Sequence, residues 1–272
     1  MKSDELNMKV PHSARVYDYW LGGKDNFAVD RALGDRIKKV VPAVPMMVRA
    51  NRQWMLRVAR FLAQEAHIRQ FLDLGTGIPT EPNLHQVVQQ IAPTGRVVYV
   101  DNDPLVLAHA RALLPSNPQG RCDYLDADLR DLDAILTSAT LASTIDLQRP
   151  VAIICASMLM LLSDADNPAA IVGKLRDWAP PGSYLAISHP TADIAAPGEM
   201  DAVVTAASTA GMTFVPRTRA DVAAMFGDWE LVEPGLVPVL AWRPDTPPDN
   251  PYAAYYWTGV ARKTAHPQVR SS

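Results

Sequence analysis

Two blocks of sequence constrain the fold of this chain more than any others: FLDLGTGIPT at 71–80 and VVYVDND at 97–103. The first is an apolar stretch that ends in an acid, followed by two glycines with one residue between them. The second is another apolar stretch, and it ends in Asp101. An α/β fold that binds a nucleotide-like ligand needs a glycine turn under the ligand and a carboxylate at the next strand end for the ribose hydroxyls. The pair therefore predicts such a fold.

The rest of the chain alternates in a way that is typical of a parallel sheet covered by helices on both faces. We expect strands at 69–74, 96–101, 121–125, 151–156 and 183–188, with helices at 28–40, 46–67, 83–91, 104–114, 131–142 and 167–178. The pattern changes after residue 189. We expect there a helical insertion over 190–216, a helix over 218–226, and strands at 229–239 and 252–263 that form an antiparallel pair at the sheet edge.

Composition excludes several classes of protein. The 272 residues fit one large domain or one domain with a cap, and 48% of them are hydrophobic, enough for a substantial core. The net charge of −3 does not favour a nucleic-acid partner, which usually meets a basic face. The longest apolar run, 151–162, is too short to cross a bilayer, and the polar N-terminus lacks a signal core. Two cysteines and no metal-type cluster favour a reduced, cytoplasmic setting without a metal site.

The glycine turn departs from the fingerprint of a nicotinamide site. The third glycine is missing, because Pro79 and Thr80 stand in its place. A pyrophosphate needs backbone amides at a helix N-terminus, and Pro79 and Pro82 have none to offer. Asp73 would also repel a diphosphate, whereas it could accept hydrogen bonds from a cationic amino group. These features favour S-adenosylmethionine, whose methionine part carries an ammonium group.

The remaining cofactor contacts follow from the strand ends. Asp101 suits the ribose diol, Asp128 could accept from the adenine amino group, and the Leu129 amide could reach a ring nitrogen. The alternative for each acid is a helix cap or a solvated loop. The expected contacts along these strand ends are Asp73, Gly75, Thr76, Gly77, Asp101, Asn102, Asp128, Leu129 and Ser157.

Several longer stretches resemble a family of actinobacterial S-adenosylmethionine-dependent methyltransferases that was long known only as a domain of unknown function. They are SARVYDYWLGGKDNF, RANRQW, RQFLDLGTGIPT, RVVYVDNDPLVLAHARALL and ELVEPGLVPV, and the resemblance runs from about residue 8 to 263. It implies a class I methyltransferase fold, a doubly wound, Rossmann-like sheet of about seven strands with an antiparallel last strand. It says much less about the substrate.

The resemblance also implies a division of the chain and further site residues. It places an N-terminal helical lid at 1–67, a cofactor-binding core at 68–263 and a flexible tail at 264–272. The GGKDNF stretch would lie beside the cofactor, where glycines allow a close backbone approach. The cofactor contacts expected from the lid are Gly22, Gly23 and Asn26, with Arg49 or Arg52 as a fork for the methionine carboxylate.

The end of the fourth strand should lie beside the transferred methyl group. It reads ICASMLMLLSD, with Met160 where the family commonly has a histidine, so that a histidine base at this position is absent. The other candidate bases are Tyr19, Asp18, His189 and Tyr17, and His189 follows the fifth strand at the carboxyl edge of the sheet. The expected substrate pocket is Tyr17, Trp20, Met158 and Met160, although the methionines could equally be core packing.

An apolar, methionine-lined wall with few bases suits a flat, electron-rich, uncharged acceptor. We therefore expect methylation, at carbon or nitrogen, of a small aromatic or indole-containing natural product, with no nucleic-acid or membrane partner. S-adenosylhomocysteine would be the product cofactor. The alternatives are a cofactor-binding regulatory protein, a nicotinamide-dependent oxidoreductase and a nucleic-acid methyltransferase. A homodimer is compatible with the sequence, which does not specify the oligomeric state.

Overall fold

One mixed sheet organises the computed structural model, which describes residues 8–113 and 117–264. Its parallel strands are β1 (Gln70–Leu74), β2 (Arg96–Asp101), β3 (Arg121–Asp126), β4 (Ala152–Ala156) and β5 (Tyr184–Pro190). The order is β3-β2-β1-β4-β5-β8-β6, and β8 (Tyr256–Arg262) runs antiparallel to β5. This arrangement confirms the Rossmann-like methyltransferase fold with a reversed last strand.

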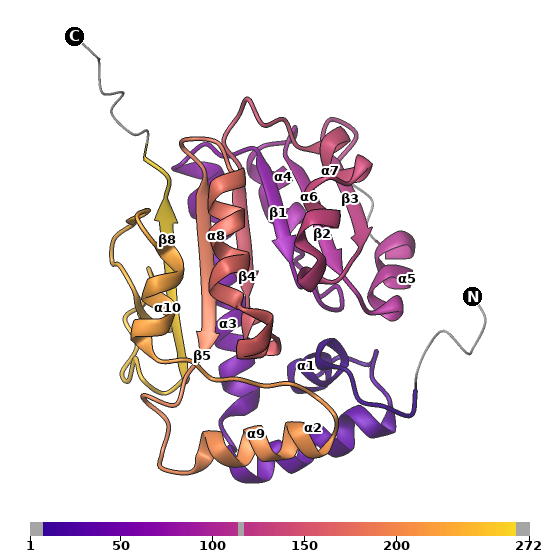
Figure 1. Cartoon of the computed structure of the whole chain (residues 1–272), viewed down its shortest axis with the longest axis vertical. Helices are drawn as coiled ribbons and strands as arrows, with labels where there is room; N and C mark the ends of the chain where they lie inside the picture. The colour runs from indigo at the N-terminus through magenta and orange to yellow at the C-terminus, as the bar shows by residue number, and fades with distance from the viewer. Residues whose placement is uncertain (1–7, 114–116, 265–272) are drawn as a thin grey trace.

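Helices cover both faces of this sheet, which is why the central strands β1 and β4 are buried along almost their whole length (Figure 1). They are α4 (Leu84–Ile91), α5 (Pro104–Leu113), α6 (Leu132–Leu136), α7 (Ala139–Thr144), α8 (Pro168–Trp178) and α10 (Arg219–Phe226). In register, Asp73 of β1 lies beside Tyr99 of β2 and Ile154 of β4. The carboxyl ends of β1, β2 and β4 therefore meet at one edge of the sheet.

Three of the expected elements differ in the structure. The helix expected over 131–142 is two short helices, because Ser138 stops the first and its side chain caps α7. The strand expected over 229–239 is reduced to β6 (Glu230–Leu231) and β7 (Val237–Pro238), both antiparallel to β8. Between them Pro234 lacks an amide hydrogen and Gly235 turns the chain at φ +86°. The insertion contains one helix, α9 (Glu199–Thr209), and is otherwise irregular.

The N-terminal helices and the insertion close the carboxyl edge of the sheet. The N-terminal helices are α1 (Ser13–Leu21), α2 (Ala28–Val40) and α3 (Val44–Gln64). Figure 1 shows α1, α2 and α9 beyond the strand ends, and α2 packs against both α1 and α9. The expected lid thus consists of two parts of the chain that are far apart in sequence. Of the expected flexible tail, residues 265–272 lie outside the described residues.

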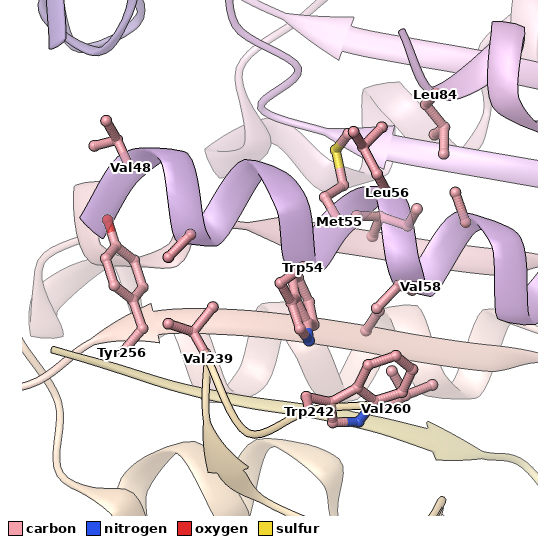
Figure 2. Close-up of a cluster of buried hydrophobic side chains, with 14 of the residues drawn as sticks. Val48, Trp54, Met55, Leu56, Val58, Leu84, Val239, Trp242, Tyr256 and Val260 are labelled. Carbon is pink, nitrogen blue, oxygen red and sulfur yellow. The ribbon is translucent and has the colours of Figure 1, made fainter. Parts of the chain in front are cut away.

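Helix α3 joins this lid to the core of the molecule. Its apolar side chains Trp54 and Val58 pack against Trp242 and Val260 on one face of the sheet (Figure 2), and the rings of Trp54 and Trp242 meet edge to face at 6.4 Å. Arg57 fixes the same region by donating hydrogen bonds to the carbonyls of Val239 and Trp242 at 2.9 and 3.0 Å. The second half of α3 therefore belongs to the same hydrophobic cluster as the sheet.

Candidate active site

A cavity of about 420 Å³ lies at the carboxyl ends of β1, β2 and β4, under α1 and the first half of α3. Its lining residues include the ends of four strands, β1, β2 and β4 and the residues that follow β3. The expected site residues that line it are Tyr17, Asp18, Arg52, Asp73, Gly75, Thr76, Gly77, Asp101, Asn102, Asp128, Leu129, Ser157, Met158 and Met160.

The glycine turn after β1 forms the floor of this cavity. Gly75 and Gly77 have φ of +72° and +69°, in the left-handed region that glycine adopts without a steric penalty. The Gly75 amide donates to the Val100 carbonyl at 2.9 Å, which ties the turn to β2. A Cβ atom on Gly75 would lie 2.2 Å from Met158 Cγ. The turn is therefore in direct contact with the residue that follows β4.

Asp101, at the end of β2, is held in place by backbone amides. Its carboxylate accepts hydrogen bonds from the amides of Gly77 at 2.8 Å and Asp103 at 3.0 Å. Burial raises the pKa of Asp101, and these two hydrogen bonds oppose that shift. A fixed, buried carboxylate beside a glycine turn fits a ribose diol.

Asp73, at the end of β1, is more strongly perturbed. Burial raises the pKa of its carboxyl group to about 7, while the nearby Arg52 guanidinium lowers it in part. A carboxylate that is this costly to ionise gains from a cationic partner, so its environment fits the ammonium group of a methionine moiety.

Asp128, beyond β3, marks the other end of the cavity. It accepts hydrogen bonds from Asn102 Nδ2 at 3.0 Å and from the Arg130 guanidinium at 2.7 Å, and the Leu129 side chain is buried beside it. Because the sheet order is β3-β2-β1-β4, Asp128, Asp101 and Asp73 follow one another along the edge. This order matches adenine, ribose and amino acid in turn. S-adenosylmethionine therefore fits the residues present.

Arg52 lines the cavity, but its guanidinium already has partners. It donates to the carbonyls of Thr80 and Pro82, and its Nε is buried without a hydrogen-bond partner among the described residues. Burial lowers its pKa. The structure thus shows Arg52 supporting the loop after β1. Arg49 is exposed and does not line the cavity.

The GGKDNF stretch is not brought to the cavity wall. Gly22, Gly23, Asn26 and Trp20 are absent from its lining, contrary to the expectation. Asn26 donates to the Asp18 carboxylate at 2.8 Å, and Gly23 is so close to that carboxylate that a Cβ would meet Asp18 Oδ1 at 1.9 Å. Asp18 therefore fixes the conformation of this loop.

Two of the candidate bases lie away from the cavity. The Tyr19 hydroxyl donates to Asp35 at 2.7 Å, because Tyr19 is on the side of α1 that faces α2, as is Trp20, whose Nε1 donates to the Gly34 carbonyl. His189 is fully buried outside the lining, with its Nδ1 2.9 Å from the Pro190 carbonyl. Burial lowers the pKa of His189 to about 4. Their positions contradict the sequence-based interpretation of both residues.

The end of the cavity beside β4 is neutral and rich in sulfur. Met158, Met160 and Met212, here called the methionine wall, line it, and the Val215 amide donates to the Met160 carbonyl at 2.8 Å. That bond fastens the segment after α9 to the end of β4. We call this region the acceptor end and the row of acids the cofactor end.

Tyr17 completes the acceptor end from α1, but its hydroxyl has no spare proton. It donates to the Val48 carbonyl at 3.0 Å and accepts from Asn51 Nδ2 at 3.0 Å. Burial raises its pKa. Tyr17 therefore serves as a pocket wall and not as a base.

Sequence reasoning missed some of the lining. Asn51 and Met55 come from α3. Asn51 is a polar residue on an otherwise apolar helix face, next to Arg52, and this position could have indicated a place in the site. Met212 and Thr213 follow α9 and stand in no recognisable pattern.

Comparison with known proteins supports this geometry. The model of a family described as S-adenosyl methyltransferase matches residues 1–264. A DUF574 family protein from Streptomyces avermitilis MA-4680 superimposes with a TM-score of 0.91 at 44% identity, covering 95% of this chain and 99% of that one. A protein from Thermobifida fusca YX does so with a TM-score of 0.88 at 42% identity, covering 96% and 97%.

A third similarity is local. Over 60 residues the chain is 38% identical to ribosomal RNA small subunit methyltransferase H of Halorhodospira halophila. The aligned segment is 22% of this chain and 18% of that protein. An O-methyltransferase family protein from Burkholderia thailandensis shares the fold, with a TM-score of 0.52 at 14% identity over 98% of this chain and 68% of that one. Among the helices that the structure describes, none is long and apolar enough to cross a membrane.

Proposed function

The chain belongs to the S-adenosyl methyltransferase family, and from this premise we propose that it methylates a small aromatic molecule, such as an indole-containing natural product, at carbon or nitrogen. The observation that carries the proposal is the neutral methionine wall of Met158, Met160 and Met212 at the acceptor end. Polarisable thioethers pack well against aromatic rings.

Methyl transfer from S-adenosylmethionine requires little chemical participation of the methionine wall. S-adenosylmethionine supplies a methyl group on a positively charged sulfur, and the thioether that leaves needs no proton. The protein therefore has mainly to align the acceptor atom and to exclude water. Met158 and Met160 of the methionine wall, which are buried, and helix α1 serve both purposes. A ring nitrogen with a free electron pair is methylated without loss of a proton, whereas methylation of a ring carbon is followed by release of the ring proton to water. Neither course requires Tyr19 or His189, which lie outside the lining.

Transfer of a labelled methyl group tests the proposal. The purified protein would be incubated with methyl-tritiated S-adenosylmethionine and, in separate reactions, with a panel of aromatic heterocycles, ribosomal subunits or total cell protein. We expect label in small molecules, identified by mass spectrometry. Label confined to RNA or protein would contradict the substrate class. Tight binding of S-adenosylhomocysteine without transfer to any of them would favour a regulatory protein.

A further inference from the structure

Ser157, the residue that follows β4, has an unusual backbone conformation. Its φ is +55°, in the left-handed region that few residues other than glycine adopt. Its amide is held there by two hydrogen bonds to Ser188, one to the carbonyl at 3.1 Å and one to the hydroxyl at 2.9 Å. Strained residues that are fixed in this way cluster at functional sites.

The Ser157 hydroxyl is partly exposed in the cavity and has two neighbours. The Tyr256 hydroxyl lies 3.0 Å from Ser157 Oγ, and Met160 Sδ lies 3.8 Å from it. Tyr256 is 5% exposed and reaches from β8 toward the first half of α3, where Val48 lies (Figure 2). It therefore sits behind Ser157, away from the cavity.

The direction of the hydrogen bond between the two hydroxyls follows from their surroundings. Burial raises the pKa of Tyr256 to about 12, so its hydroxyl keeps its proton at neutral pH. Within the part of the chain that the structure describes, Ser157 is the one hydrogen-bond partner of that hydroxyl. If Ser157 donated, the Tyr256 proton would be buried without an acceptor, which is unfavourable. Tyr256 therefore donates and Ser157 accepts.

This direction leaves the Ser157 proton with a poor partner. The Met160 thioether is a weak acceptor and its distance is long. The hydrogen bond received from Tyr256 also polarises the Ser157 hydroxyl and makes it a better donor. A donor on a half-buried residue that lines the cavity, satisfied only by a thioether, is available for a ligand.

We propose that the Ser157 hydroxyl donates a hydrogen bond to the methyl acceptor in place of Met160 Sδ. The acceptor then carries a neutral hydrogen-bond-accepting atom, a ring nitrogen or a carbonyl oxygen, close to the methylated position. The inference rests on the proposed function and narrows its substrate class. It also moves Ser157 from the expected cofactor contacts to the acceptor end, because β4 lies on the side of β1 opposite to Asp101.

Three flat probes of similar size test the inference without knowledge of the natural acceptor. Quinoline has a ring nitrogen that accepts, indole has a ring N–H that donates, and naphthalene has neither. Their affinities for the protein saturated with S-adenosylhomocysteine would be measured by ligand-observed NMR titration. We expect quinoline to bind about tenfold more tightly than naphthalene, the contribution of one hydrogen bond, and indole to show no such advantage.

The variant Ser157→Gly removes the hydroxyl and suits the left-handed backbone, so that the fold and its thermal stability should be kept. We expect the quinoline preference to disappear in it, and to fall to about threefold in Tyr256→Phe, which no longer polarises Ser157. The matched control is Thr213→Val, which removes another hydroxyl of the cavity and should keep the preference.

Equal affinities of quinoline and naphthalene in the unmodified protein, including no binding of either, would overturn the inference. So would a preference that survives in Ser157→Gly, one that is lost in Thr213→Val, or an indole preference that depends on Ser157. Failure of the proposed function is a separate result, since it is measured as methyl transfer and not as probe binding.

Discussion

At the cofactor end of the cavity, carboxylates lie at successive strand ends, and Asp101 among them is fixed by the backbone amides of Gly77 and Asp103. At the acceptor end, neutral side chains arrive from β4, from α1 and from the segment after α9, and that segment is linked to the end of β4 by the Val215–Met160 hydrogen bond. The first construction belongs to the sheet and recognises a fixed ligand. The second depends on how distant segments pack, so it can differ between relatives while the sheet stays the same.

The largest expected effect falls on the cofactor end. Asp101→Ala removes a buried carboxylate and leaves two amides unpaired, so we expect the affinity for S-adenosylhomocysteine, measured by calorimetry, to fall at least about 100-fold. Met160→Leu, at the acceptor end, is the matched control and should change it less than about threefold. Similar losses in both variants would show that the two ends are not separate.

Gly75→Ala tests a place where the two ends meet. The new Cβ would lie 2.2 Å from Met158 Cγ on a backbone of φ +72°, so we expect about 30-fold weaker S-adenosylhomocysteine binding and a loss of about 1–3 kcal/mol in unfolding free energy. Adding Met158→Ala should recover part of both losses, because it removes the Cγ atom and leaves the Met158 Cβ, 2.8 Å from the new atom, and the backbone strain. No recovery would mean that the contact with Met158 is unimportant.

The pH dependence of cofactor binding should come from Asp73. Burial raises its pKa to about 7, and only the ionised form pairs with an ammonium group, so affinity should rise from pH 6 to pH 8 and then level off. About a tenth of the carboxyl groups are ionised one unit below the pKa, so the affinity at pH 6 should be about tenfold lower than the plateau. Asp73→Asn should bind weakly with a flat profile, and a retained slope would assign the titration elsewhere.

The smallest effect is expected at His189. Its pKa of about 4 leaves it neutral from pH 6 to 8, and it does not line the cavity. His189→Gln should therefore keep methyl transfer within about threefold, and the shape of the pH–rate profile should not change. A 100-fold loss of methyl transfer in a variant with an intact fold would show that His189 acts as a base. It would contradict the description of the acceptor end as a site without a base.

The sequence predicted the sheet, and the residues expected at its strand ends line the cavity, because both depend on local signals. The apolar strand of 96–101 and the acid that ends it are adjacent in the chain, and the structure places that strand where it was expected. The expected helix over 131–142 was wrong because Ser138 can stop one helix and cap the next with a single side chain.

The acceptor end was less predictable for a physical reason. Tyr19 and Tyr17 are two residues apart on one helix, and only packing decides that Tyr17 faces the cavity and Tyr19 faces α2. Met212 reaches the cavity because its segment is fastened to β4 through Val215 and Met160, a contact between residues that are far apart in the sequence.

The unbroken course of α3 has a mechanical consequence. Its 21 residues span roughly 30 Å, and its second half is anchored by Trp54, Val58 and Arg57, so the helix cannot swing aside as a gate. We therefore expect a nucleoside-sized ligand to enter by displacement of α1 and the loop that follows it. Amide hydrogen exchange should be fast in α1 and slow in α3 before binding, and ligand should slow it in α1 alone.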